Sequence, residues 1–566
     1  MNPAHALHLA AVGFLVSVTT LGQVKPVSPS TGPASKNGTI KGRVVAADTE
    51  LGLSKATITI FAQESNSEAE PRVVRTNENG DYEVTGLKGG RYTILAARSG
   101  YLNHFYGHRL PGGFLQGPGA PLQIREGETL SDINFRLVLA GAIEGRILDV
   151  SGEPMARATV QLSKFRNLGG RRRLVTERGA RAETDDRGRF RLFEVPPGSY
   201  YLEARRHFAL KVADGDRTAI PPTYYPGVLD PMEATRIEVG PGSEIQGVDV
   251  ALLEVRGFSV SGRVVAQERL GREIYLMARR FGSDGNVGAY STSGRSDRMG
   301  RFTIRNVIPG KYLITAQSDD SSPTAIQSGV LSGTRELEVT DTDVAEVTIP
   351  VGYGGEIDGR IEWPGDTSTL DTRKIRVEVA PEANFEGFYL AQGGGEVTRD
   401  LKFSFKGVSE RRVRLSVLLP LGPHYVKSIR IEGREVVDQV LEIHNNDRLQ
   451  VVASIAADGA EVAGIAKAEA GDAPVQGATI LARARGDSRA SARFRGRTLT
   501  DQEGRFSMRG LPPGNYLLAA FANLEFGGET DPEFVKVFEK TARHVELSPG
   551  QVLNETLKVI PVAPSQ

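Results

Sequence analysis

Apolar and polar residues alternate over short runs along most of this chain. Tyr200, Leu202 and Ala204 occupy every second position of one run, Phe190 and Leu192 do so in the run before it, and a Pro-Pro-Gly segment separates the two. A period of two places apolar side chains on one face of a β-strand. No segment keeps the apolar period of a helix over several turns. The pattern predicts many short antiparallel strands joined by turns, with helices a minor component.

One block of sequence recurs four times, at residues 76–96, 184–204, 296–316 and 500–520. Each block opens with Thr or Ser, then Asp or Asn, and a Gly three residues later, which is the composition of a tight turn. An alternating strand follows, and then a corner that in two blocks reads Pro-Pro-Gly, which cannot continue a strand ladder. A block that repeats at long intervals indicates an array of small modules.

The predicted opening strand of each module occurs five times rather than four. Its glycines are Gly42, Gly145, Gly262, Gly359 and Gly464. About seven strands in roughly 100 residues predict an antiparallel sandwich of the immunoglobulin-like class. We therefore expect five modules at residues 38–140, 141–254, 255–352, 353–455 and 456–562. The fourth is degenerate, because it lacks the turn Gly and the Pro-Gly corner, and we expect its corner to be looser.

The first 37 residues differ from the rest. Residues 6–22 (ALHLAAVGFLVSVTTLG) carry no charged side chain and are too short for a stable membrane span. They are typical of a secretory signal peptide, which we place at residues 1–22. A buried amphipathic helix is the alternative interpretation. Residues 23–37 are rich in Pro, Ser and Gly and predict a flexible linker.

Composition narrows the classes of partner and site. The chain has no cysteine, which excludes disulfides, thiolate metal sites and a lipoprotein anchor. Lys plus Arg and Asp plus Glu both total 69, so the net charge of zero does not favour nucleic acid. No other apolar run approaches membrane length, so we expect no transmembrane span in the mature chain. The sequence thus predicts an exported protein of the periplasm, the cell surface or the extracellular space.

The repeated pattern T-D-x-x-G-[RD]-[FY] followed by P-P-G-x-Y resembles the carboxypeptidase regulatory-like domain family. The resemblance covers modules one, two, three and five well and module four poorly. It implies a transthyretin-like sandwich, a fold also grouped with carbohydrate-binding-like folds. Carbohydrate is therefore the ligand class that the resemblance favours, although such modules accompany many different activities.

Motifs for catalysis are missing from the sequence. A zinc carboxypeptidase needs a His-x-x-Glu pair and a distant third ligand, but none of the eight histidines has Glu three residues later. His104 and His108 are four residues apart, but the surrounding Tyr and Gly predict a loop rather than a metal-binding helix. No G-x-S-x-G or phosphate-binding loop is present. The densest basic run, at residues 171–173, is predicted to lie in a loop between strands. The sequence predicts neither an enzyme nor a cofactor or metal site.

Tyrosines fall into two groups. Tyr92, Tyr200, Tyr312 and Tyr516 recur at one step after the corner, where a hydroxyl can bond upstream backbone as in a tyrosine corner. We predict a structural role for these four. The aromatic residues that do not recur are candidate ligand contacts, since exposed rings can stack on sugars: Tyr101, Phe105, Tyr106, Tyr224 and Tyr225. The alternative is that they cap a sandwich or pack against a neighbouring module.

The leading functional hypothesis is a non-catalytic, exported, multi-module binding or spacer protein of the bacterial envelope. Its expected partner is a polysaccharide or another envelope protein. The alternative hypothesis is an accessory subunit of a separate envelope enzyme or transport complex. Lys41 and Asn134 lie in the first and last strands of module one, where surface adhesins form isopeptide bonds. We predict no such bond, because the lysine is absent from the other modules.

Overall fold

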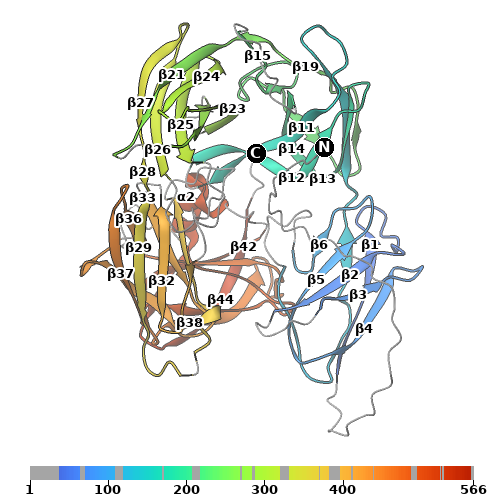
Figure 1. Cartoon of the computed structure of the whole chain (residues 1–566). Coiled ribbons are helices and arrows are strands. Elements are labelled where there is room, and N and C mark those ends of the chain that lie inside the picture. Colours follow the sequence, from blue (N-terminus) through green and yellow to red (C-terminus); the bar gives the residue numbers. More distant parts are fainter. Residues whose placement is uncertain are drawn as a thin grey trace, which may run out of the picture.

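The structure is a computed structural model that describes residues 37–63, 70–108, 119–168, 171–206, 217–267, 270–282, 287–318, 331–368, 370–381, 395–408, 412–436, 439–485, 494–522, 524 and 528–562. We use module 1 to module 5 as names for the five predicted ranges. The signal peptide and linker predicted at residues 1–37 lie almost wholly outside the described residues. Figure 1 shows strands in every part of the described chain, which confirms the all-β class.

Module 1 packs two sheets face to face. One sheet has the order β4-β1-β8, with β9 also paired to β1, and the other has the order β3-β2-β5-β6, with β7 paired to β5. The strands are β1 (Gly38–Ala46), β2 (Thr57–Ala62), β3 (Arg72–Arg75), β4 (Asp81–Leu87), β5 (Gly90–Ala97), β6 (His104–Phe105), β7 (Leu122–Ile124), β8 (Thr129–Leu130) and β9 (Phe135–Leu137). Apolar residues of both sheets are buried between them, as strand alternation requires.

Modules 2 and 3 repeat this plan. Module 2 comprises β10 (Gly141–Leu148), β11 (Ala158–Leu168), β12 (Arg171–Glu183), β13 (Arg189–Val195), β14 (Gly198–Arg206), β15 (Thr218–Ala219), β16 (Thr223–Tyr224), β17 (Ile237–Val239), β18 (Glu244–Ile245) and β19 (Val250–Ala251). Next come β20 (Val255–Arg256), β21 (Phe258–Val265), β22 (Ile274–Phe281), β23 (Val287–Arg295), β24 (Arg301–Val307), β25 (Gly310–Ser318), β26 (Leu331–Val339), β27 (Val344–Pro350) and β28 (Gly352–Tyr353). The basic run at residues 171–173 begins strand β12, so its predicted placement in a loop is wrong.

Modules 4 and 5 depart from the plan in different ways. Module 4 contains β29 (Gly355–Glu362), the 3-10 helix η2 (Thr372–Lys374), β30 (Arg376–Pro381), β31 (Gly395–Glu396), β32 (Lys402–Val408), β33 (Arg412–Leu418), β34 (Tyr425–Ile431), β35 (Arg434–Glu435), β36 (Val440–Glu442) and β37 (Arg448–Ala456). Module 5 contains β38 (Ala460–Ala468), β39 (Thr479–Ala484), β40 (Phe494–Leu499), β41 (Arg505–Leu511), β42 (Gly514–Ala522), η5 (Gly528–Thr530), α2 (Pro532–Thr541), β43 (Arg543–Leu547) and β44 (Val552–Pro561). In module 5 the last strand, β44, pairs with both β38 and β42 and joins the two sheets into one.

Helix α2 covers the outer face of the module 5 sheet. Asp531 caps its N-terminus through a bond from the Glu533 amide, and Pro532 occupies the first turn. Phe534 and Phe538, four residues apart, lie on one side of the helix and pack against Phe521. The pattern of apolar residues does not predict this helix, because only two of its residues, Phe534 and Phe538, are buried.

Six hydrophobic clusters lie in the described part of the chain, and the buried residues of each belong to one predicted range. Five of them are the sandwich cores, one in each predicted range, and the sixth lies between helix α2 and the module 5 sheet. This distribution is what five sandwich modules would produce, while the residue boundaries between them stay a prediction.

The repeated Thr ties the turn to the second strand. In module 2 the Thr184 hydroxyl accepts a bond from the Ala158 amide (2.8 Å) and donates one to the Met155 carbonyl (2.6 Å). Thr76 and Thr500 make the same two bonds in modules 1 and 5. Because these bonds are largely buried, a side chain without a hydroxyl would leave backbone groups unpaired. The repeated Thr is therefore part of the scaffold.

The repeated Asp shapes the turn itself. The Asp185 carboxylate accepts bonds from the backbone amides of Arg187 (2.9 Å) and Arg189 (2.7 Å). Gly188 completes the turn with φ +69°, in the left-handed region. Asn77, Asp297 and Asp501 repeat the arrangement. In module 4 the non-glycine residue Leu401 takes this place with φ +57°.

The first strand of a module needs glycine at one position, because the returning strand passes too close to leave room for a side chain. A Cβ on Gly145 would lie 1.9 Å from the Val248 carbonyl oxygen, which no real contact allows. Gly42 and Gly262 meet a carbonyl at the same distance. The recurrence of this glycine therefore reflects packing between strands.

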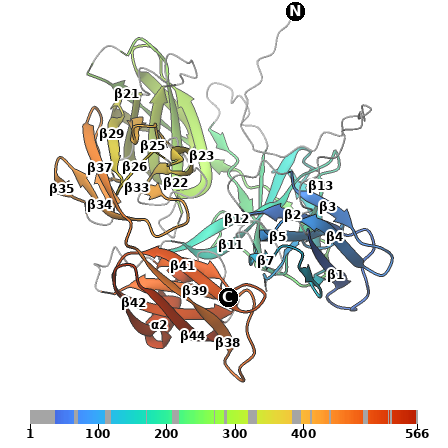
Figure 2. The same cartoon turned by 90° about the horizontal axis from the view of Figure 1, so that it is seen from below.

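The described modules follow a closed path. Figures 1 and 2 show module 5, in orange and red, beside module 1, in blue, although the two are farthest apart in sequence. The Gln502 side-chain amide donates to the Gln123 carbonyl (3.4 Å), and strand β11 of module 2 contacts η5 of module 5. The last module thus docks on the first two.

Candidate functional site at the junction of modules 1 and 5

The hydroxyl of each of the four recurring tyrosines bonds the corner of its own module. Each hydroxyl donates to the carbonyl of the residue four positions earlier. The pairs are Tyr92 with Lys88 (2.8 Å), Tyr200 with Pro196 (2.8 Å), Tyr312 with Ile308 (2.7 Å) and Tyr516 with Pro512 (2.8 Å). All four rings are buried, and module 4 has the buried Val413 at this step. These bonds have the geometry expected of a tyrosine corner, and the structural role of the four residues stays a prediction.

The two candidate tyrosines of module 2 face inward. Tyr224 is 4% exposed, and its hydroxyl lies 3.2 Å from a carboxylate oxygen of the buried Glu203. Burial raises the pKa of Glu203, while the Arg205 guanidinium opposes that rise. Burial also raises the pKa of Tyr224, and the Glu203 carboxylate adds to the effect. Tyr225 packs partly buried against the module 2 core. The Tyr224 ring is therefore too buried to stack on a sugar, while Tyr225 is partly exposed.

The three candidates of module 1 differ from one another. Tyr101 packs against the module 1 core and forms an isolated bridge with Leu139. Phe105 is half-buried, and its ring centroid lies 5.9 Å from that of His108. Tyr106 is 9% exposed and lies edge-on to Phe135. Of the five candidates, Tyr106 alone is among the residues lining the cavity described next.

A cavity of about 420 Å³ lies where module 5 meets module 1. Its wall includes His104, Tyr106, Asn134 and Arg136 of module 1 and Gln476 of module 5. Burial raises the pKa of the Tyr106 phenol, and the nearby Gln476 amide opposes that rise. Because Gln476 of module 5 completes a lining that module 1 otherwise forms, the cavity has this shape only when the two modules are docked.

His104 lies in strand β6, and the turn after this strand holds its ring in one orientation. Its Nε2 atom lies 2.9 Å from the His108 carbonyl oxygen, which can only accept, so Nε2 carries the proton. Burial lowers the pKa of His104, so the ring is neutral and its Nδ1 atom is an acceptor. The four-residue spacing of His104 and His108 thus serves a bond across the turn after strand β6. No group of three or more metal-ligating side chains occurs among the described residues.

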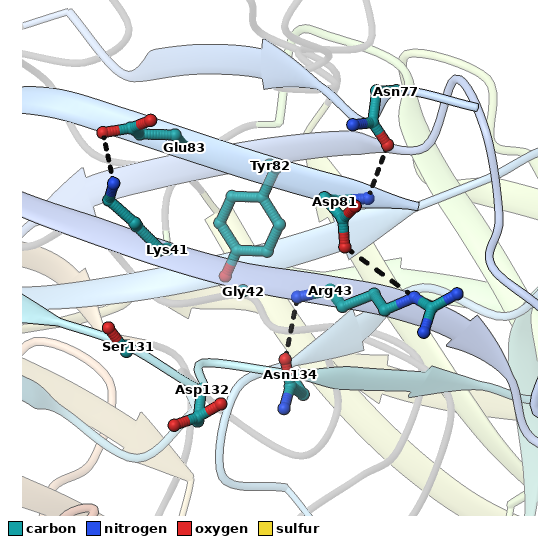
Figure 3. A pocket seen from close by; sticks show the side chains of 10 residues that line it. All are labelled: Lys41, Gly42, Arg43, Asn77, Asp81, Tyr82, Glu83, Ser131, Asp132 and Asn134. Carbon is teal, nitrogen blue, oxygen red and sulfur yellow. Dashed lines mark hydrogen bonds and ion pairs between the residues drawn. The ribbon is translucent and has the colours of Figure 1, made fainter. Parts of the chain in front are cut away.

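A second, larger hollow of about 540 Å³ lies on the outer face of module 1 (Figure 3). There the Lys41 ammonium pairs with Glu83 (3.1 Å), and Asn134 accepts a bond from the Arg43 amide (2.8 Å). Figure 3 shows Lys41 turned toward Glu83 and away from Asn134. Each of the two residues considered for an isopeptide bond therefore has another partner. Within the same described ranges, no helix is long and apolar enough to cross a bilayer.

The sequence analysis named Tyr106 as a candidate ligand contact but did not name Gln476. A comparison of the modules at residue 477, next to Gln476, could have drawn attention to it. Gly477 stands at the step occupied by Lys55 in module 1 and Arg157 in module 2, and each amide bonds the carbonyl of the repeated Thr. A glycine at a position where two modules carry long side chains indicates a local contact that the other modules lack.

Comparisons with known proteins bear on the fold. Residues 39–138 and 142–216 match the family model of the carboxypeptidase regulatory-like domain. No curated protein matches the chain. Solved structures with similarity include the minor pilin GBS52 of Streptococcus agalactiae, at 12% identity over 39% of this chain and 97% of that chain with a TM-score of 0.22. Others are the major pilin subunit BcpA of Bacillus cereus (12% identity, 56% and 99%, TM-score 0.14) and two B repeats of the collagen-binding protein of Staphylococcus aureus (9%, 75% and 100%, 0.12).

Scores this low carry no argument about function, so the fold rests on strand pairing. In modules 1 and 2 the first strand pairs antiparallel with the strand after the turn and parallel with the short returning strands, in closely corresponding registers. The two segments that match the carboxypeptidase regulatory-like family model, residues 39–138 and 142–216, thus lie within a tandem array of β-sandwich modules.

Proposed function

We propose that this chain is an exported, non-catalytic binding or spacer protein of the bacterial envelope, with carbohydrate as its ligand class. One observation carries the proposal. The residues that recur from module to module bond their own module: the Thr and Asp hold a turn, the Tyr holds a corner, and the Gly admits a strand. Repetition in this chain therefore serves the scaffold.

The residues that do not recur support the binding part of the proposal. Tyr106 and Gln476 belong to single modules and meet at a cavity between them. Ligand sites commonly occupy such clefts between domains. The uncharged segment at residues 6–22 supports export.

A glycan array and polysaccharide pull-down with residues 23–566 test the proposal. We expect retention on at least one neutral cell-wall or plant polysaccharide. Uniform absence of binding would refute carbohydrate as the ligand class and leave only the spacer role. The location is tested separately by fractionation of cells: recovery in the cytoplasm would contradict export.

A further inference from the structure

We infer that the cavity between modules 1 and 5 binds one uncharged sugar residue, and that binding requires the last module to be docked on the first. This inference rests on the proposed carbohydrate-binding function and assigns it to named residues. The cavity volume of about 420 Å³ lies within the range of small-molecule sites.

The wall of the cavity offers the groups that recognise neutral polyols. Asn134 and Gln476 carry side-chain amides, which combine a donor and an acceptor and so match neighbouring hydroxyls. Tyr106 supplies an aromatic ring and a hydroxyl. The Arg136 guanidinium already pairs with the Glu50 carboxylate, and His104 is neutral. The lining therefore favours an uncharged ligand over an anion.

The Gln476 amide joins the two modules at this wall. It lies beside the Tyr106 hydroxyl and opposes the rise in the pKa of that phenol, as a hydrogen-bond donor does. Hydroxyl groups both accept and donate, so a sugar in the cavity can bond the amide and hydroxyl groups of this wall.

Docking of the two modules depends on Gly477. Its φ of +67° is not the reason for glycine, because Lys55 (φ +58°) and Arg157 (φ +57°) adopt the same conformation at this step in modules 1 and 2. A Cβ on Gly477 would lie 1.7 Å from the carbonyl oxygen of Gly107 in module 1. The glycine is therefore required by the contact with module 1 and not by the fold of module 5.

Three substitutions in the full chain separate these effects. Gly477→Asn keeps the left-handed backbone that Asn tolerates but forces the junction apart. Gly471→Asn is the matched control, because Gly471 has φ +81° in the same module and nothing within 4 Å of its Cβ position. Gln476→Ala removes the only amide that module 5 contributes to the described lining, without requiring a change of backbone conformation. Circular dichroism melts establish that each variant folds, and small-angle X-ray scattering reports whether the array opens.

Binding is measured by saturation-transfer-difference NMR with the methyl glycosides of glucose, galactose and N-acetylglucosamine. We expect the native chain and Gly471→Asn to bind at least one glycoside with equal Kd. We expect Gly477→Asn and Gln476→Ala to bind it at least tenfold more weakly. If Gly477→Asn does not fold, Gln476→Ala decides the result.

Four results would overturn the inference. Equal glycoside binding by the native chain, Gly477→Asn and Gln476→Ala would place the sugar elsewhere while the proposed function stands. Polysaccharide retention without binding of any of the three glycosides would do the same. Displacement of the glycoside by inorganic phosphate would contradict an uncharged ligand. Absence of both glycoside and polysaccharide binding would remove the proposed carbohydrate function itself.

Discussion

The hydroxyl of Tyr312 provides the sharpest stability test, because its bond is the most deeply buried of the four tyrosine corners. The ring is fully buried, and its hydroxyl donates to the carbonyl of Ile308, itself a buried residue. Tyr312→Phe keeps the ring but leaves that carbonyl without a partner and out of reach of water. An unpaired buried acceptor costs about 1–3 kcal/mol of unfolding free energy.

Tyr92→Phe is the matched control. The Tyr92 hydroxyl bonds the carbonyl of Lys88, which is exposed, so water can replace the lost donor. The expected cost is then only the net value of one hydrogen bond, about 0.5–1.5 kcal/mol. The two substitutions are chemically identical, so any difference between them measures the burial of the partner.

Hydrogen–deuterium exchange of the full chain reads each corner separately, which a single melting curve of a multi-module protein cannot do. Peptides covering β25 report on module 3, and peptides covering β5 report on module 1. When a segment recloses faster than its open amides exchange, the opening equilibrium sets the exchange rate. A loss of 1.4 kcal/mol then appears as a tenfold faster exchange. We expect at least fivefold acceleration in β25 of Tyr312→Phe and a smaller change in β5 of Tyr92→Phe. Equal acceleration in both, or none in β25, would refute the reasoning.

Three further outcomes are expected. Gly145→Ala should unfold module 2 selectively or lower its stability by several times the ~1 kcal/mol typical of a point substitution, because its Cβ meets the Val248 carbonyl at 1.9 Å; unchanged exchange in module 2 would contradict this. Burial lowers the folded pKa of His104, so the unfolded state binds more protons below its ordinary value of about 6.5. Module 1 should therefore lose stability as the pH falls from 7 to 5, and His104→Gln should lose less; parallel pH profiles would count against the assignment. Intact mass should show no loss of ammonia, because Lys41 and Asn134 have other partners, and a deficit of one ammonia traced to them would overturn the prediction.

The repeated blocks made the fold predictable, because their residues act within one module. A Thr, an Asp, a Gly and a Tyr at fixed spacing each satisfy a local backbone requirement, and these requirements recur wherever the turn and corner recur. The apolar alternation gave the sheet faces for the same reason. The strand position of the basic run at residues 171–173 was not predicted, because Gly169 and Gly170 precede the run in the sequence and glycines there indicate a loop.

The junction could not be predicted in the same way. Tyr106 and Gln476 are separated by most of the chain, and contacts between distant modules leave no periodic signal. The sequence placed Tyr224 among the loop aromatics. In the structure its hydroxyl bonds the buried carboxylate of Glu203, which lies on a different strand, β14. Gly477 is the residue whose type reflects the docking, because a Cβ there would meet the Gly107 carbonyl. This reason for glycine becomes visible only when the structure places Gly107 beside it.

Docking of the last module on the first is tested most directly by a cross-link. The chain has no cysteine, so Gln123→Cys with Gln502→Cys introduces the only two thiols, at residues whose side chain and carbonyl lie 3.4 Å apart. A short bismaleimide should join them within one chain in native buffer, and adding Gly477→Asn or denaturant should abolish the product. Cross-linked dimers alone, or an intramolecular product that persists with Gly477→Asn, would contradict the closed array.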